Sequence, residues 1–129
     1  MVLLINTSQN DLIQIKLIHQ DKIIRQAESH EKFQQAEFLL KMVSRVVGKN
    51  KLKAVAVVSG PGAFSALRFG LTTANILAWS LRIPVIGLTV GEIQNNKRLP
   101  ELLESKLKGM KKGDFKPVMP QYGHEPNIT

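Results

Sequence analysis

Two short polar stretches carry the residues best suited to hold an anion. The sequence GPG at 60–62 follows an apolar run and precedes a long apolar segment, which predicts a turn at the head of a helix, where free backbone N–H groups attract anions. The sequence NTS at 6–8 follows the first apolar run. The weak anion-site candidates are Thr7, Ser8, Gly60 and Gly62. We favour the structural alternative, polar turns in which glycine supplies a positive φ and short polar side chains bond the backbone.

The sequence shows no recognisable pattern of catalytic residues. Ser59, Ser65 and Ser80 lack a recognisable base, and no G-x-S-x-G elbow is present. The histidines are scattered and lack metal-ligand spacing. Two-metal nuclease chemistry needs carboxylates at strand ends, whereas the first strand ends at Asn6 and the fourth at Ser59. No lysine follows the GPG turn as in a Walker A loop. We therefore expect no catalytic residue, no metal, no cofactor and no enzyme activity.

The elements that would position these stretches follow the order βββαβαβ. Continuous or alternating apolar runs predict strands at residues 2–5, 11–18, 22–27, 54–58 and 83–88. Helical spacing predicts helices at 31–47, 64–81 and 100–108, with Ser29 as N-cap of the first and Gly48 as its C-terminal stop. The predicted fold class is α/β: a ribonuclease H-like or actin-like ATPase lobe, with a three-strand antiparallel meander and parallel βαβ units.

The two longer helices are apolar over more than one face. In the second, apolar residues cover about two-thirds of the circumference, well beyond the ~100° stripe that one sheet covers. Phe64, Leu67, Leu71, Ala74, Ala78 and Leu81 form the stripe. A second side must be covered by another helix or another protein. The interface candidates are Phe33, Leu40, Phe69, Ile76, Trp79 and, on the polar edge, Arg68.

The segment GPGAFSALRFGL at 60–71 resembles the G-P-G-S-F-T-G-L-R-I-G-L segment of the TsaB (YeaZ) family. The resemblance continues through residues 73–88, and residues 120–127 are similar to the P-x-Y-x-R-x-P-type ending of TsaB-like proteins. Asn6 departs from the usual Asp, and Ala63 and Ala66 replace Ser and Gly. We expect a shortened, single-lobe form of the family. We expect one TsaB-like N-terminal lobe at 1–108 and an irregular tail at 109–129.

This resemblance implies a non-catalytic subunit of the machinery that makes tRNA threonylcarbamoyladenosine. Such a subunit pairs through its helices with TsaD, the catalytic subunit, and works beside the ATPase TsaE. A homodimer is the corresponding expectation for the chain alone. The departures, above all the neutral Asn6, weaken the case for nucleotide binding and for TsaE contact more than the case for TsaD pairing.

The composition leaves a second and a third function open. A net charge of +8, with many lysines between Lys97 and Lys116, is compatible with a basic module that docks tRNA through Lys106–Lys116, or with a solvated surface. The third possible function is that of a degenerate actin-like nucleotide-binding protein. The chain has no cysteine, no basic leader and no apolar run of the ~20 residues that span a bilayer, so we expect a cytoplasmic protein without membrane contact.

Overall fold

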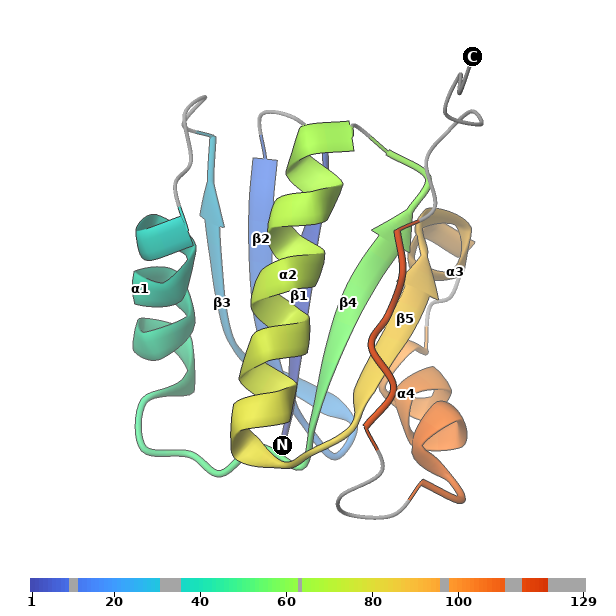
Figure 1. Ribbon diagram of the computed structural model, residues 1–129. Coiled ribbons are helices and arrows are strands. Elements are labelled where there is room, and N and C mark those ends of the chain that lie inside the picture. The colour runs from blue at the N-terminus through green and yellow to red at the C-terminus, as the bar shows by residue number, and fades with distance from the viewer. Residues whose placement is uncertain (10–11, 31–35, 63, 96–97, 111–114, 121–129) are drawn as a thin grey trace.

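The structure is a computed structural model and describes residues 1–9, 12–30, 36–62, 64–95, 98–110 and 115–120. Within these ranges, a five-stranded sheet carries two helices on each face (Figure 1). The strands are β1 (Val2–Gln9), β2 (Leu12–His19), β3 (Lys22–Ser29), β4 (Ala54–Gly60) and β5 (Val85–Thr89). The helices are α1 (Ala36–Val47), α2 (Phe64–Leu81), α3 (Val90–Asn95) and α4 (Leu99–Leu107).

The strand order confirms the predicted ribonuclease H-like layout. The sheet has the order β3-β2-β1-β4-β5. β1, β2 and β3 form the antiparallel meander, while β4 pairs in parallel with both β1 and β5. Each parallel pair requires a crossover, which α1 and α2 supply on the same face of the sheet. The carboxyl ends of β1 and β4 therefore meet at the edge where α2 begins.

The first strand is longer than the sequence predicted. Residues 6–9 were expected to form a polar turn, but β1 continues through Gln9, which pairs with Leu12. The turn prediction was wrong because the polar side chains here have hydrogen-bond partners that allow the strand to continue. Asn6 Nδ2 donates to Gln14 Oε1 at 3.1 Å on β2. The strand can therefore continue without burying an unsatisfied amide.

The predicted N-cap of the first helix was wrong. Ser29, the expected N-cap, is the last residue of β3 and pairs with Ile13. The described part of α1 begins at Ala36, and residues 31–35 lie outside the described residues. The predicted stop is confirmed: Gly48 has a φ of 57°, and its N–H donates to Ser44 O at 2.9 Å. This is the left-handed C-terminal turn that glycine makes without steric strain.

Two apolar cores lie on opposite faces of the sheet. Ile13, Ile15 and Leu17 alternate on β2 toward the α1 and α2 side, whereas Val2 and Leu4 on β1 point to the α3 and α4 side. β4 is buried along its whole length, because side chains on both of its faces are covered by helices. The order of helices and strands thus makes a three-layer unit with the sheet in the middle.

α2 has the bounds that the apolar pattern predicted, and most of its buried stripe is confirmed. Leu67, Leu71, Ala74 and Ala78 are buried against the sheet. Leu81 was placed on the same stripe, but it is 48% exposed. Leu81 is the last residue of the helix, and its side chain lines a hollow between α1 and α2.

A strand-like segment from the end of the chain lies beside α2 and crosses β5. Residues 115–120 belong to no described helix or strand, yet Asn75 on α2 holds Val118 by two hydrogen bonds. Asn75 Nδ2 donates to Val118 O at 3.0 Å, and Val118 N–H donates to Asn75 Oδ1 at 2.9 Å. Val118 also covers Gly87 of β5, where a Cβ atom would lie 2.9 Å from its side chain. The segment therefore covers a third side of α2.

The opposite face is closed by two short helices. Leu99 and Leu103 of α4 are buried against β1 and β4, and Val90 and Ile93 of α3 pack beside them. Across the described part of the chain, no helix has both the length and the apolar character needed to cross a membrane.

Candidate functional site

The anion-site candidates meet where β1 ends beside the start of α2. Thr7 is buried, and its Oγ1 donates to Ala66 O at 2.7 Å in the first turns of α2. Gly70, one turn further along, lies directly under this side chain. A Cβ atom at Gly70 would be 2.1 Å from Thr7 Oγ1, so only glycine fits. The Thr7 hydroxyl thus anchors α2 to the sheet.

Glycine is required at the two positions of the GPG turn for different physical reasons. Gly60 has a φ of 129°, as expected for a residue that must enter a tight turn. Gly62 has no such φ, but a Cβ atom there would be 2.3 Å from the carbonyl oxygen of Ser8. The backbone of the turn therefore packs directly on the backbone of β1. The sequence pattern identified Gly60 as a turn residue but missed this close approach.

The remaining polar groups at this edge form a chain of hydrogen bonds across the meander. Ser8 donates to Asn6 Oδ1 through both its Oγ, at 2.7 Å, and its backbone N–H, at 3.0 Å. Asn6 then donates to Gln14 on β2, and Gln14 Nε2 donates to Glu28 Oε1 on β3 at 2.8 Å. The side chains that could have bound a ligand are already bound to one another.

The structure therefore brings Thr7, Ser8 and Gly62 together, but as a packed joint. Ser8 presents its carbonyl oxygen to the Gly62 turn, and a carbonyl dipole pointing at this place repels an anion. Both hydroxyls donate to oxygens of the chain. This arrangement favours the structural interpretation of the four candidates. Among the residues that the structure describes, no three His, Asp or Glu side chains gather closely enough to hold a metal ion.

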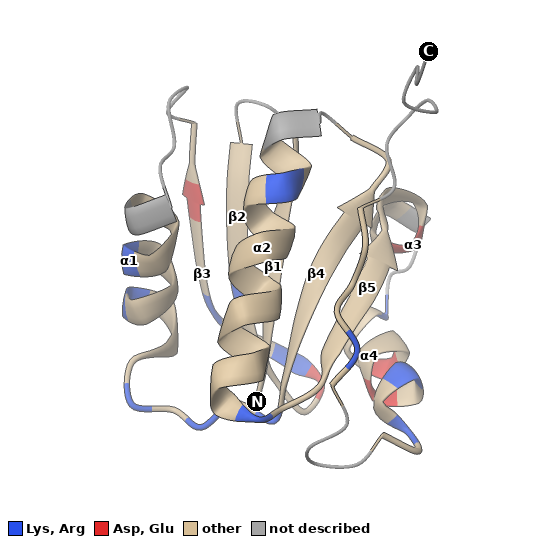
Figure 2. Cartoon of the chain, in the orientation of Figure 1, with Lys and Arg blue, Asp and Glu red and all other residues tan. Residues whose placement is uncertain are grey.

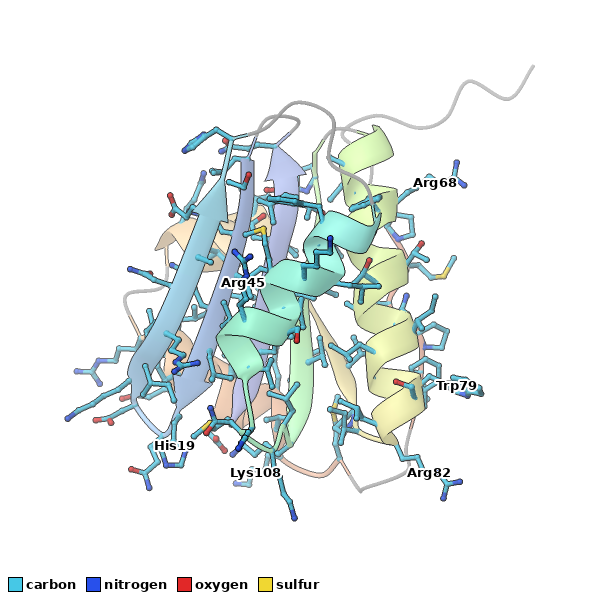
Figure 3. The ribbon with its side chains drawn as sticks, turned by 90° about the vertical axis from the view of Figure 1, so that its left-hand side faces the viewer. His19, Arg45, Arg68, Trp79, Arg82 and Lys108 are labelled. Atoms are coloured by element: carbon cyan, nitrogen blue, oxygen red, sulfur yellow. The ribbon has the colours of Figure 1, made fainter. Side chains whose placement is uncertain are left out.

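Among the described side chains of α1 and α2, four large apolar ones are exposed on the helical face, and we call them the helix patch. Ile76 is 60% exposed and Trp79 is 66% exposed, and both lie in the second half of α2. Leu40 on α1 and Leu81 at the end of α2 are each about half exposed. Figure 3 shows Trp79 pointing away from the sheet, on the same side of α2 as Arg68. Neither the sheet nor the neighbouring helix covers these side chains.

The other interface candidates have different surroundings. Phe69 is half-buried and packs against the core between the helices and the sheet, so it contributes more to folding than to a free surface. Arg68 is exposed at the edge of the patch. Phe33 lies outside the described residues.

A groove runs between the last turns of α1 and α2, and we call it the α1–α2 groove. Its volume is about 630 Å³. It is lined by Leu40, Val43, Ser44, Val47, Gly48, Asn50, Lys51, Leu52, Leu77, Leu81 and Ile83. Two residues of the helix patch, Leu40 and Leu81, thus form opposite walls of one apolar hollow. The sequence pattern missed Leu81 as a surface residue because its spacing matches the buried stripe.

The lysine-rich stretch late in the chain is only partly a free basic surface. Lys106 Nζ lies 3.0 Å from Glu92 Oε2, and Arg98 Nη1 lies 3.6 Å from Glu101 Oε2. Lys108 and Lys116 are exposed. Lys97, Lys111 and Lys112 lie outside the described residues.

Comparison with protein families connects this fold to tRNA modification proteins. Residues 27–101 match the family described as TsaD, tRNA N6-adenosine threonylcarbamoyltransferase. The chain is 30% identical over 89 residues to the tRNA threonylcarbamoyladenosine biosynthesis protein TsaB of Bacillus subtilis, which covers 65% of this chain and 38% of that protein. It is 42% identical over 50 residues to a tRNA N6-adenosine threonylcarbamoyltransferase of Carboxydothermus hydrogenoformans, covering 39% of this chain and 15% of that protein.

Solved structures give the same family. YeaZ from Pseudomonas aeruginosa superposes with a TM-score of 0.55 at 27% identity, over 68% of this chain and 42% of that one. A second structure, described as similar to the peptidase YeaZ of Pseudomonas aeruginosa, gives 0.56 at 26% identity over the same shares. The chain thus spans less than half the length of these relatives. The family match at residues 27–101 covers more than half of the chain and shows that this protein belongs to the family described as TsaD, and the similarity to TsaB and YeaZ supports a TsaB (YeaZ)-type member of that family.

Proposed function

We propose that this chain is a non-catalytic subunit in the biosynthesis of tRNA threonylcarbamoyladenosine, and that it pairs with a TsaD-like catalytic subunit through the helix patch. The observation that carries the proposal is the exposure of Ile76 and Trp79 on a helix whose other sides are already covered. Large apolar side chains exposed side by side mark interaction sites more often than free surface. Aromatic residues of this kind are also the usual energetic centres of interfaces.

The relatives support a pairing of two similar folds. One family profile, described as TsaD, matches this chain, and the relatives include both a TsaB and a threonylcarbamoyltransferase. Two related folds can pair α1 and α2 against the same helices of the partner, which gives a pseudo-symmetric contact. In the absence of the partner, a second copy of this chain offers the same surface, so we propose a homodimer for the chain alone.

The test is light scattering after size-exclusion chromatography, with the chain alone and mixed with the TsaD-like protein of the same organism. We expect a homodimer that exchanges into a one-to-one heterodimer. Ile76→Glu should weaken either pair by tens of fold or more in Kd, because a charge replaces an apolar anchor at the centre of the contact. Its melting temperature should stay close to that of the parent, since the Ile76 side chain is 60% exposed.

Ile23→Glu is the matched control, since Ile23 is another isoleucine with 45% exposure. It pairs with Ile18, whose side chain belongs to the core on the α4 side, so it lies away from the helix patch. This variant should pair like the parent. A folded Ile76→Glu protein that still forms both pairs would exclude the helix patch as the interface.

A further inference from the structure

Positive charge gathers at one end of the sheet, opposite to the edge where β1 meets the start of α2. We define the basic end as Lys49 and Lys51 in the loop before β4, Arg82 in the loop before β5, and Lys108 after α4. All four residues are exposed. None of them forms an ion pair with a carboxylate of the described residues, unlike nearby Lys53, which pairs with Glu104.

Figure 2 shows the blue segments along the lower edge of the molecule, in the loops after α1 and α2. In Figure 3, the Arg82 and Lys108 side chains extend outward at this same end. Lys51 lines the α1–α2 groove together with Leu81 and Ile83, which places it beside the loop that carries Arg82. The cations therefore come from three separate loops and share one surface.

Arg82 occupies a backbone conformation that an arginine rarely adopts. Its φ is 56°, in the left-handed region that favours glycine. It ends α2 in a Schellman turn: Ile83 N–H donates to Ala78 O at 3.0 Å, and Arg82 N–H donates to Trp79 O at 3.2 Å. α1 ends in a left-handed turn at the same end of the sheet, but there the residue is Gly48. A strained arginine in a position suited to glycine indicates that its side chain has a use.

Helix ends account for only part of this charge. The C-termini of α1 and α2 each carry a partial charge of about −0.5, which favours nearby cations. At α1 this role is already filled by Arg25, whose Nη1 donates to Arg45 O at 3.2 Å. Four unpaired cations exceed what the two helix ends neutralise, so the basic end keeps a positive field for an external polyanion.

We propose that the basic end binds the phosphodiester backbone of RNA. The proposal rests on the proposed function in tRNA modification, which supplies RNA as the polyanion present in the reaction. The surface consists of cations on loops, as phosphate contacts require. The apolar residues of the two loops before β4 and β5 do not form a membrane anchor, because Leu52 is half-buried and Ile83 and Pro84 are buried. This surface differs from Lys106–Lys116, where Lys106 is paired with Glu92.

The test is fluorescence anisotropy of a labelled tRNA transcript, titrated with the full chain at several salt concentrations. Four phosphate contacts predict a slope of log K against log [salt] near −3, at roughly 0.7–0.9 per contact. The triple variant Lys49→Gln, Lys51→Gln, Lys108→Gln should lower the affinity by about tenfold or more and flatten the slope by about 2.

The matched control is Lys16→Gln, Lys41→Gln, Lys116→Gln. It also lowers the net charge from +8 to +5, since three lysines are neutralised, but it leaves the basic end intact. This control should keep the slope and most of the affinity. Equal losses in the two triple variants would mean that net charge alone attracts RNA, and a larger loss in the control would place the contact elsewhere. Either result overturns the proposal.

Arg82→Gly separates binding from folding. Glycine relieves the left-handed conformation, so the melting temperature should stay constant or rise by a few degrees while RNA affinity falls severalfold. A variant that folds as well and binds RNA as tightly as the parent would remove Arg82 from the site.

Phosphatidylserine vesicles and polyglutamate are the alternative polyanions. The proposal fails if either one binds the basic end as tightly as tRNA at equal charge concentration, because the surface would then serve a membrane or an acidic protein. RNA binding is measured without a TsaD-like partner, and pairing is measured without RNA. A chain that pairs but does not bind RNA would therefore overturn this inference alone, whereas the reverse result would overturn the proposed pairing alone.

Discussion

At the scale of single residues, the joint between β1 and α2 depends on the absence of two side chains. Gly70→Ala would place a Cβ atom 2.1 Å from Thr7 Oγ1, and Gly62→Ala would place one 2.3 Å from Ser8 O. We expect each change to lower the free energy of unfolding by about 2 kcal/mol or more, because overpacking a closed joint forces the backbone to move. Urea denaturation measures this. Gly91→Ala is the control, since its Cβ would meet only an ordinary contact at 3.8 Å.

The two clashes should respond differently to a second substitution. Adding Thr7→Ala to Gly70→Ala removes the clashing hydroxyl and methyl groups, so the double variant should be more stable than the sum of the single changes predicts. The clash at Gly62 is with backbone atoms of Ser8, which no truncation of a side chain removes. Additive effects of Thr7→Ala and Gly70→Ala would contradict direct contact between the two residues.

At the scale of elements, Asn75 connects α2 to the segment 115–120. Asn75→Ala removes both hydrogen bonds to Val118 and should release the segment, with a loss of about 1–2 kcal/mol in stability. Asn75→Asp keeps an acceptor for Val118 N–H but loses the donor to Val118 O, so we expect an intermediate effect. Hydrogen exchange of the Val118 amide reports the release directly. Unchanged protection of that amide in Asn75→Ala would mean that other contacts hold the segment.

A capping box sets the start of α3 and makes it sensitive to acid. Thr89 N–H donates to Glu92 Oε1 at 3.0 Å, and Glu92 N–H donates to Thr89 Oγ1 at 3.1 Å. The hydrogen bond from the Thr89 backbone and the contact with Lys106 hold the pKa of Glu92 below its ordinary value. A lowered carboxyl pKa stabilises the fold above the ordinary value of about 4.3, and this contribution is lost as the pH falls through the folded-state pKa.

Glu92→Gln should therefore destabilise the protein by about 1 kcal/mol at neutral pH, and the difference from the parent should shrink below about pH 4. Thermal unfolding at several pH values measures it. The control is Glu101→Gln, whose carboxylate makes only an exposed ion pair with Arg98 and should contribute little. A Glu92→Gln difference that stays constant down to pH 3 would contradict the role of its charge.

Regular patterns predicted the elements well, whereas contacts between distant residues were not predictable. Apolar spacing identified α2 with its bounds and the parallel βαβ unit that it forms with β4 and β5. It failed at residues 6–9, because the partner that allows Asn6 to remain in a strand is Gln14, on another strand. It failed at Leu81 because helical spacing does not report the hollow between α1 and α2 that leaves this side chain exposed.

The candidate site, too, was predictable from patterns along the chain but not in its contacts between distant residues. The exposure of Ile76 and Trp79 depends on how α1 and the segment 115–120 cover the other sides of α2, which are contacts between residues far apart in the sequence. Both residues were among the interface candidates, but their apolar spacing alone did not separate them from half-buried Phe69. The T-x-x-E signature at Thr89 was visible in the sequence and predicts the start of a helix, yet so short a helix has too little periodicity to be identified.

At the scale of the whole molecule, the net charge of +8 should act in opposite directions on two kinds of association. Two copies of this chain repel each other, and added salt screens that repulsion, so self-pairing should strengthen between low and physiological ionic strength. Binding to RNA should weaken over the same range, because each counterion released from the RNA gains less entropy when the surrounding salt is more concentrated. Analytical ultracentrifugation at several salt concentrations measures the first effect. Self-pairing that weakens with salt would indicate that attraction between unlike charges, rather than the apolar helix patch, drives it.

The two outer strands of the sheet also face different risks in a crowded cell. A β-strand at the edge of a sheet offers unpaired backbone groups onto which a foreign strand can add, which is a common start of aggregation. The segment that carries Val118 covers the α2-side face of β5 at Gly87, whereas no described segment pairs with the outer edge of β3, which exposes Ile23 and Ile24. Lys22 and Arg25 flank these two isoleucines, and a second copy adding here in antiparallel fashion would bring like charges together. Repulsion between these charges thus protects β3 from strand addition. Neutralising both Lys22 and Arg25 should make the protein form fibrils on gentle heating.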